Sequence, residues 1–180
     1  MIEIAVQSDG WPAEDWRSTV NSASLAAIAV TPYASIVTAA TAIEVAIRLT
    51  SDAEVQALNR DYRSKDAPTN VLSFPMLERG ELEALCSRAG GSPSHDQSGF
   101  PLSREYLLGD IILAYETCAR EAAAKNITLE AHAQHLIIHG TLHLLGYDHI
   151  SDEDAQVMES LERRIMALIG LHDPYDDEDD

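Results

Sequence analysis

The chain has 180 residues, enough for a single domain with a sizeable hydrophobic core. Its 30 acidic and 12 basic side chains give a formal net charge of −18, which favours solubility and opposes a general attraction of the whole surface to nucleic acid. The two cysteines, Cys86 and Cys118, form no C-x-x-C motif, and the sequence lacks the features of a signal peptide or a membrane span, so we expect a soluble protein of the reducing cytoplasm.

Apolar and polar residues alternate in two stretches of the first 50 residues and predict two strands. The pattern covers residues 2–6 and 42–49, and the second stretch places four aliphatic side chains on one face. Residues 12–29 are alanine-rich and predict a helix that ends before Pro32. Ser51 then opens the capping box S-D-A-E, which predicts the start of a second helix.

The remainder of the chain continues this interleaving of strands and helices. Residues 71–74 predict a short strand closed by Pro75, and the apolar run at 107–114 is typical of a strand covered on both faces. Further helices are expected over about residues 115–125, 129–145 and 151–170. The pattern predicts one α/β (α+β) domain over residues 1–175, with a small mixed sheet of about four strands packed with about five helices.

Three further predictions concern residues 78–104, the C-terminal residues and the last helix. Residues 78–104 mix charge, glycine, serine and proline, which predicts a long surface loop in which His95 is solvated. Residues 176–180 are all acidic and are expected to form a disordered tail. The last helix is expected to bury a continuous apolar stripe consisting of Val157, Met158, Leu161, Ile165 and Leu168.

The stretch H-G-T-L-H-L-L-G-Y-D-H, from His139 to His149, carries the clearest chemical pattern. On a helix, His139 and His143 lie on one face about 6 Å apart along the axis, where two imidazoles can bind one metal ion. Gly146 can end the helix and reverse the chain, which would return His149 as a third ligand. Three protein ligands leave one position open for water, which is typical of a catalytic site; the alternative is a set of half-buried structural histidines.

Two further histidines lie on roughly the same face of this predicted helix. His135 and His143 would be separated by about 12 Å, too far to share one ion, so we expect His132 and His135 to be ordinary helix residues. Three neutral imidazoles suit one zinc ion per chain, although other divalent transition metals such as nickel or copper also bind imidazole. We therefore predict that His139, His143 and His149 hold Zn²⁺.

The residue after the first of these histidines bears on the reaction class. Zinc proteases of the H-E-x-x-H type carry their general base at this position, which is Gly140 in this chain. The protease interpretation is therefore disfavoured, unless a carboxylate from elsewhere serves as the base. Asp148 is the nearest candidate, and a role in orienting a histidine is an equally good explanation of it.

Three motifs together resemble the YbeY family of bacterial endoribonucleases and rRNA maturation factors. They are residues 139–149, the block L-N-R-D-Y-R-S-K-D-A-P-T-N-V-L-S-F-P at 58–75, and L-L-G-D-I-I-L at 107–113. The resemblance implies a mixed sheet with helices packed on it. The chain departs from the family pattern in the longer connection at 78–104 and at Asn70, where the family often has aspartate.

The resemblance also implies an activity and a set of partners. It implies a metal-dependent endoribonuclease specific for single-stranded RNA, which matures the 3′ end of 16S rRNA and serves ribosome quality control. The implied partners are rRNA and the small ribosomal subunit or its proteins, with neither DNA nor a membrane among them.

Arg63 and His139 are the predicted catalytic residues. The resemblance places the functional arginine of the family at Arg63, and a guanidinium can bind phosphate through two hydrogen bonds. Arg60 and Lys65 are candidates for an RNA-tracking groove. Two other functions stay open: a zinc metalloprotease with a base outside the histidine helix, and a non-catalytic ribosome-assembly factor with a structural metal.

Overall fold

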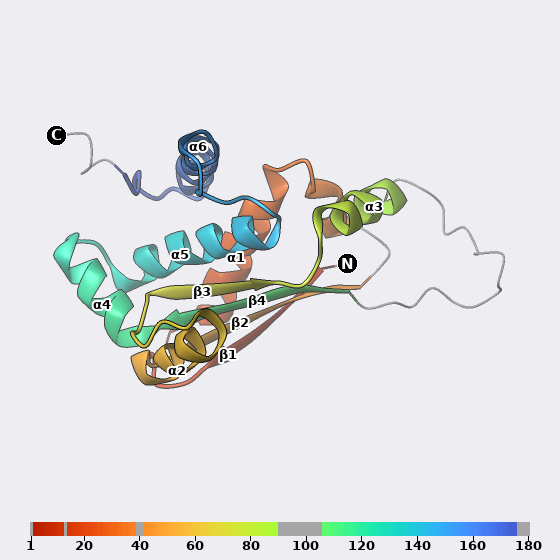
Figure 1. The fold of residues 1–180 in the computed structure, drawn as a ribbon. Helices are drawn as coiled ribbons and strands as arrows, with labels where there is room; N and C mark the ends of the chain where they lie inside the picture. Colours follow the sequence, from red (N-terminus) through yellow and green to blue (C-terminus); the bar gives the residue numbers. More distant parts are fainter. Residues whose placement is uncertain (1, 13, 39–41, 90–105, 176–180) are drawn as a thin grey trace.

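The computed structural model describes residues 2–12, 14–38, 42–89 and 106–175, which form a four-stranded mixed sheet with helices on both faces (Figure 1). The strand order is β1-β2-β4-β3. The strands are β1 (Ile2–Ser8), β2 (Ile43–Thr50), β3 (Val71–Pro75) and β4 (Tyr106–Ala114). The first, second and fourth strands run parallel, and β3 pairs with β4 as an antiparallel edge strand. The predicted fold class is confirmed.

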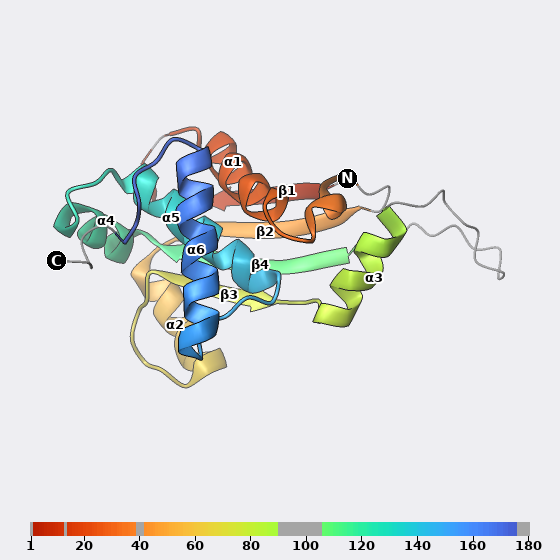
Figure 2. The ribbon, with the colours of Figure 1, turned by 90° about the horizontal axis from the view of Figure 1, so that it is seen from above.

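The helices cover the two faces of the sheet unequally. They are α1 (Trp16–Ala29), α2 (Asp52–Arg63), α3 (Arg79–Ala89), α4 (Tyr115–Ala124), α5 (Leu129–Leu144) and α6 (Asp152–Leu168), with the short 3-10 helix η1 (Ala34–Thr38). Helices α1 and α5 pack on one face and α2 lies on the opposite face (Figure 1). Helix α6 packs on the outer side of α1 and α5 and forms a third layer (Figure 2).

The alternating strands build the core as the sequence indicates. In β2, Ile43, Val45, Ile47 and Leu49 are fully or almost fully buried and belong to the large cluster shared with α1 and α5. In β4, Ile111 and Leu113 join that cluster, whereas Ile112 and Ala114 join a smaller one with α2. The central strand β4 is thus covered on both faces, which explains its continuous apolar run.

Side-chain caps fix the starts of four helices. At the start of α1, the Asp15 carboxylate accepts from the Ser18 N–H at 3.2 Å. The Oγ of Ser51 accepts from the Glu54 N–H at 3.5 Å, and the hydroxyls of Thr128 and Ser151 cap α5 and α6 at 3.1 and 3.2 Å. These bonds satisfy backbone N–H groups that have no partner inside the helix. Within the described part of the chain, no helix has the length and apolar character needed to span a membrane.

The expectation of a surface loop over residues 78–104 is wrong in its first part, because Arg79–Ala89 is helix α3. Its Leu82 and Leu85 lie three residues apart on one face of the helix and are buried in the main core. Burial of these two side chains favours a helix despite the glycine, serine and charged residues around them. The rest of that segment, with His95, lies outside the described residues, as does the predicted disordered tail at 176–180.

The predicted apolar stripe of α6 is only partly correct. Met158 and Ile165 are buried, but Val157 and Leu168 are 53% and 65% exposed. Glu162 takes a fully buried position instead. The face of α6 that meets α5 lies over two histidine rings, and these polar groups require a hydrogen-bonding partner rather than an aliphatic one.

Gly109 lies at an irregularity of β4 where no side chain fits. The pairing of β2 with β4 shifts there by one residue, and Gly109 has a φ of +148°. A Cβ atom at this position would lie 2.3 Å from the backbone oxygen of Phe74 and 2.7 Å from a methyl group of Leu144. The glycine therefore allows both β3 and α5 to approach β4 closely.

We predict that Gly109→Ala lowers the free energy of unfolding by about 2–5 kcal/mol, because it adds backbone strain to a steric overlap with a carbonyl group that cannot move aside. Urea denaturation measures the change. Gly80→Ala is the matched control, since a Cβ there meets no atom within 4 Å, and its stability should stay the same or rise by up to about 1 kcal/mol. Equal stabilities of the two variants would contradict this packing.

Candidate metal centre

On helix α5, the two candidate histidines lie next to the face of the helix that packs closely against the sheet. Gly140, Thr141 and Leu144 are buried, whereas His139 and His143 are half-buried. A Cβ atom at Gly140 would lie 2.8 Å from the Ile111 side chain and 3.0 Å from the Ser73 hydroxyl. The helix can therefore approach the sheet closely, and the two histidine rings lie on a different side of it from Gly140.

The chain reverses directly after α5. The N–H groups of Gly146 and Tyr147 donate to the carbonyl oxygens of His143 and Leu142 at 3.0 and 3.1 Å, and Gly146 has a φ of +84°. This arrangement is typical of a helix that ends in a left-handed glycine. The Asp148 carboxylate accepts from the Ile150 N–H at 3.0 Å and supports the link that carries His149.

The reversal brings the three predicted histidines together. One ring nitrogen each of His139, His143 and His149 lies within 4.8 Å of the other two. The Nε2 atoms of His139 and His143 are 3.0 Å apart. Two nitrogens bound at about 2.0–2.1 Å to one tetrahedral ion would be roughly 3.3 Å apart, so the donor set fits a single metal ion.

The opposite nitrogens of the two helical rings are held by acceptors. The His143 Nδ1 lies 2.9 Å from the carbonyl oxygen of Tyr147, and the His139 Nδ1 lies 2.9 Å from the Glu162 carboxylate. A carbonyl oxygen can only accept, so the His143 Nδ1 carries the proton and its Nε2 keeps a free lone pair. The carboxylate imposes the same tautomer on His139. Both free lone pairs therefore lie on Nε2.

The electrostatics favour a neutral His143 ring and an ionised Glu162 carboxylate. Burial and the neighbouring His139 lower the pKa of His143 to about 4, so its ring is neutral at pH 7, as metal binding requires. Burial alone would raise the pKa of Glu162, but hydrogen bonds from His135 and His139 outweigh it and bring that pKa to about 2. The Tyr175 hydroxyl donates to the same carboxylate at 2.6 Å.

The other two histidines of α5 bind carboxylates. The His135 Nε2 lies 2.6 Å from Glu162, and the His132 Nε2 lies 2.8 Å from Glu121. Neither ring joins the group of three among the described residues. Glu162 had no role in the interpretation of the sequence; the available signal was a single carboxylate inside an otherwise apolar helix stripe.

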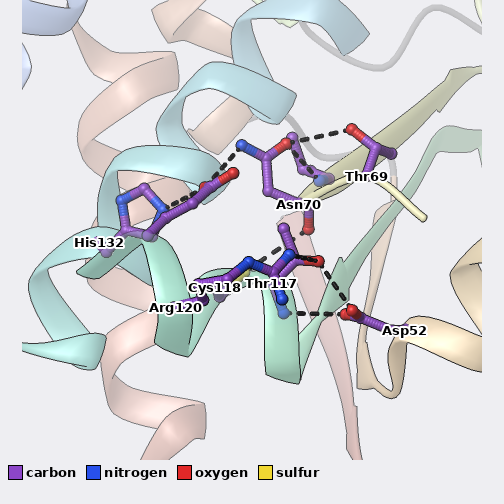
Figure 3. A network of polar contacts seen from close by, with 9 residues as sticks. Asp52, Thr69, Asn70, Thr117, Cys118, Arg120 and His132 are labelled. Atoms are coloured by element: carbon purple, nitrogen blue, oxygen red, sulfur yellow. Dashed lines mark hydrogen bonds and ion pairs between the residues drawn. The ribbon is translucent and has the colours of Figure 1, made fainter. Parts of the chain in front are cut away.

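Asn70 contributes to a polar network that includes His132 of α5 (Figure 3). Its amide donates to Glu121 at 3.0 Å, and its side-chain oxygen accepts from the Val71 N–H at 2.7 Å. An aspartate here would place a second carboxylate against Glu121, so an amide suits this network better. The network joins the start of β3 to α4 and α5.

Arg63 is the last residue of α2 and is exposed. Its side chain makes no hydrogen bond or ion pair with any other described residue, whereas the Arg60 side chain pairs with Asp61 at 3.1 Å. Its guanidinium is therefore available to a ligand. The structure records no contact between Arg63 and the three histidines, and its catalytic role stays a prediction.

Known proteins resemble this chain over nearly its whole length. The family model described as Endoribonuclease YbeY matches residues 12–170. Endoribonuclease YbeY of Sphingopyxis alaskensis is 51% identical over 170 residues, or 94% of each chain, and that of Rhizorhabdus wittichii is 51% identical over 177 residues, or 97% of each chain.

A solved structure has the same fold. The solution structure of TM1509 from Thermotoga maritima matches with a TM-score of 0.51 and 20% sequence identity, and the match covers 93% of this chain and 91% of that one. The sequence matches agree with the three motifs, and the chain belongs to the YbeY family.

Proposed function

We propose that this protein is a metal-dependent endoribonuclease that cleaves single-stranded RNA. The observation that carries the proposal is the convergence of His139, His143 and His149, with the Nδ1 atoms of the first two bound to fixed acceptors. The relatives named Endoribonuclease YbeY support the reaction class.

The three histidines would hold one divalent ion, for which zinc is well suited because all three ligands are imidazoles. Such an ion supplies positive charge that favours the build-up of negative charge on a phosphoryl oxygen. The exposed face of His149 leaves the site open to a polymer. Arg63 would bind a non-bridging phosphate oxygen, for which its planar group provides paired donors.

The arrangement of α5 disfavours the alternative of a zinc protease. A side chain at Gly140 would meet Ile111 and Ser73 rather than the metal ligands, so no general base fits at the position used by H-E-x-x-H enzymes. The carboxylate of Asp148 already accepts a hydrogen bond within its own turn. A purely structural metal is disfavoured by the exposure of His149.

The proposed biological role is maturation of the 3′ end of 16S rRNA and ribosome quality control in the cytoplasm. It rests on family membership alone. The formal charge of −18 opposes unaided binding to RNA, so a protein of the small ribosomal subunit is the proposed partner that delivers the enzyme to its substrate.

Two variants separate metal binding from phosphate binding. We expect His143→Ala to lose both bound metal and cleavage of single-stranded RNA, because only two ligands remain. We expect Arg63→Ala to keep its metal and to lose cleavage by about a hundredfold or more, as for removal of a charged group that stabilises the transition state.

Elemental analysis of the purified proteins and a cleavage assay on labelled single-stranded RNA measure these effects. His172→Ala, which removes an exposed histidine outside the group of three, is the control and should match the parent protein. Metal-free parent protein that still cuts RNA would contradict the site, and parental cleavage by Arg63→Ala would contradict the role of that residue.

Glu162→Gln tests the support of the metal ligands. It removes the anion that orients His139 through Nδ1, so we expect metal affinity to fall by about 10–100-fold with the fold retained. Competition with a chromophoric chelator measures the affinity, and circular dichroism measures the fold. The matched control is Glu121→Gln, which alters an equivalent contact to His132. Equal losses of affinity in both variants would show that Glu162 has no specific role.

A further inference from the structure

A cavity of about 460 Å³ lies next to the link between α5 and His149. Its lining includes Tyr147 and Asp148, the two residues that precede His149 in the link after α5. The carbonyl of Tyr147 also binds the Nδ1 of His143. The cavity and the candidate metal centre therefore share one segment of backbone.

Helix α3 forms the opposite wall of this cavity. Leu82 and Leu85 anchor the helix in the main core, and its Cys86 and Ser87 line the cavity. In Figure 1, α3 lies beyond the end of β3 on the face of the sheet that carries α5.

The lining suits a flat, uncharged ring with hydrogen-bond donors. A volume of a few hundred Å³ is typical of small-ligand sites. Tyrosine and aliphatic side chains, among them Tyr33, Tyr147 and Val157, offer surfaces on which a ring can stack or pack.

The charges of the lining disfavour a phosphate group. Arg79 is already paired with Glu83 at 3.2 Å, while Asp148 and Asp154 add two further carboxylates. An anion would be repelled, whereas the N–H groups of a nucleobase can donate to carboxylate oxygens.

We infer that this cavity binds one unstacked base of a single-stranded RNA whose phosphate lies at the three histidines. The inference rests on the proposed function and adds the recognition of a base to it. A base inside a duplex is paired and stacked and cannot enter, so the cavity provides a physical reason for preference for single strands.

Cys86 reports directly on occupation of the cavity. It is partly exposed, whereas Cys118 is buried and burial raises the pKa of its thiol to about 12, so alkylation is selective for Cys86. We expect a saturating 2′-O-methyl single-stranded oligonucleotide, which resists cleavage, to slow N-ethylmaleimide modification of Cys86 by about tenfold, measured by mass spectrometry. Duplex RNA and an oligonucleotide without bases should not protect it.

A pair of tryptophan variants tests the cavity without use of the thiol. Val157→Trp fills the space from α6, and we expect it to lower kcat/KM for single-stranded RNA by about tenfold, the effect of losing one stacked base, with metal content unchanged. Gln156→Trp, at the exposed neighbouring position outside the lining, should stay within about twofold of the parent.

The outcomes separate this inference from the proposed function. A parent protein that cleaves RNA, together with equal activities of the two tryptophan variants or protection of Cys86 by the base-free oligonucleotide, would overturn the base-binding cavity alone. Protection by an arginine-rich peptide but not by RNA would also overturn it, in favour of a protein partner. A parent protein that neither binds nor cleaves RNA would overturn the proposed function itself.

Discussion

The buried carboxylate of Glu162 is the interaction on which the candidate site depends most. An isolated charge in a protein interior costs several kcal/mol, so it persists only where donors surround it. Here two histidines of α5 and the hydroxyl of Tyr175 provide those donors. The same bonds that stabilise the anion also fix the orientation of His139. The C-terminal helix is therefore part of the site, although it contributes none of the three converging histidines.

Close packing of α5 on the sheet provides the second constraint. Gly140 on the helix faces Ile111 of β4, and Gly109 on β4 faces Leu144 of the helix, so each element has a glycine where the other approaches. This reciprocal contact sets the height of α5 above the sheet. It also determines which face of α5 can carry functional side chains. Position 140 faces the sheet, so a side chain there would meet Ile111 and Ser73.

The sequence predicted those features that depend on local pattern. The alternation in β2, the continuous apolar run of β4 and the spacing of His139, His143 and Gly146 all correspond to elements that the structure contains. The grouping of the three histidines follows from that spacing and from one tight turn. Metal binding by them, like the role of Arg63, stays a prediction.

The features that the sequence did not predict depend on contacts between distant segments. Glu162 is buried only because α6 packs over the histidines of α5, 23 residues from His139 in the chain. The helical part of residues 78–104 forms because Leu82 and Leu85 reach the main core, and its composition hides that signal. The cavity beside Tyr147 requires both of these elements, so no single stretch of sequence encodes it.

Histidine side-chain NMR during titration with zinc tests the central claim most directly. Signals of nitrogen-15 distinguish Nδ1 from Nε2 in each ring, so the bound atoms can be identified. At one equivalent of zinc, we predict large changes at the Nε2 of His139 and His143 and at one ring nitrogen of His149, with both helical Nδ1 atoms still protonated. Unchanged signals from these three rings, or binding at His132 or His135 instead, would contradict the account.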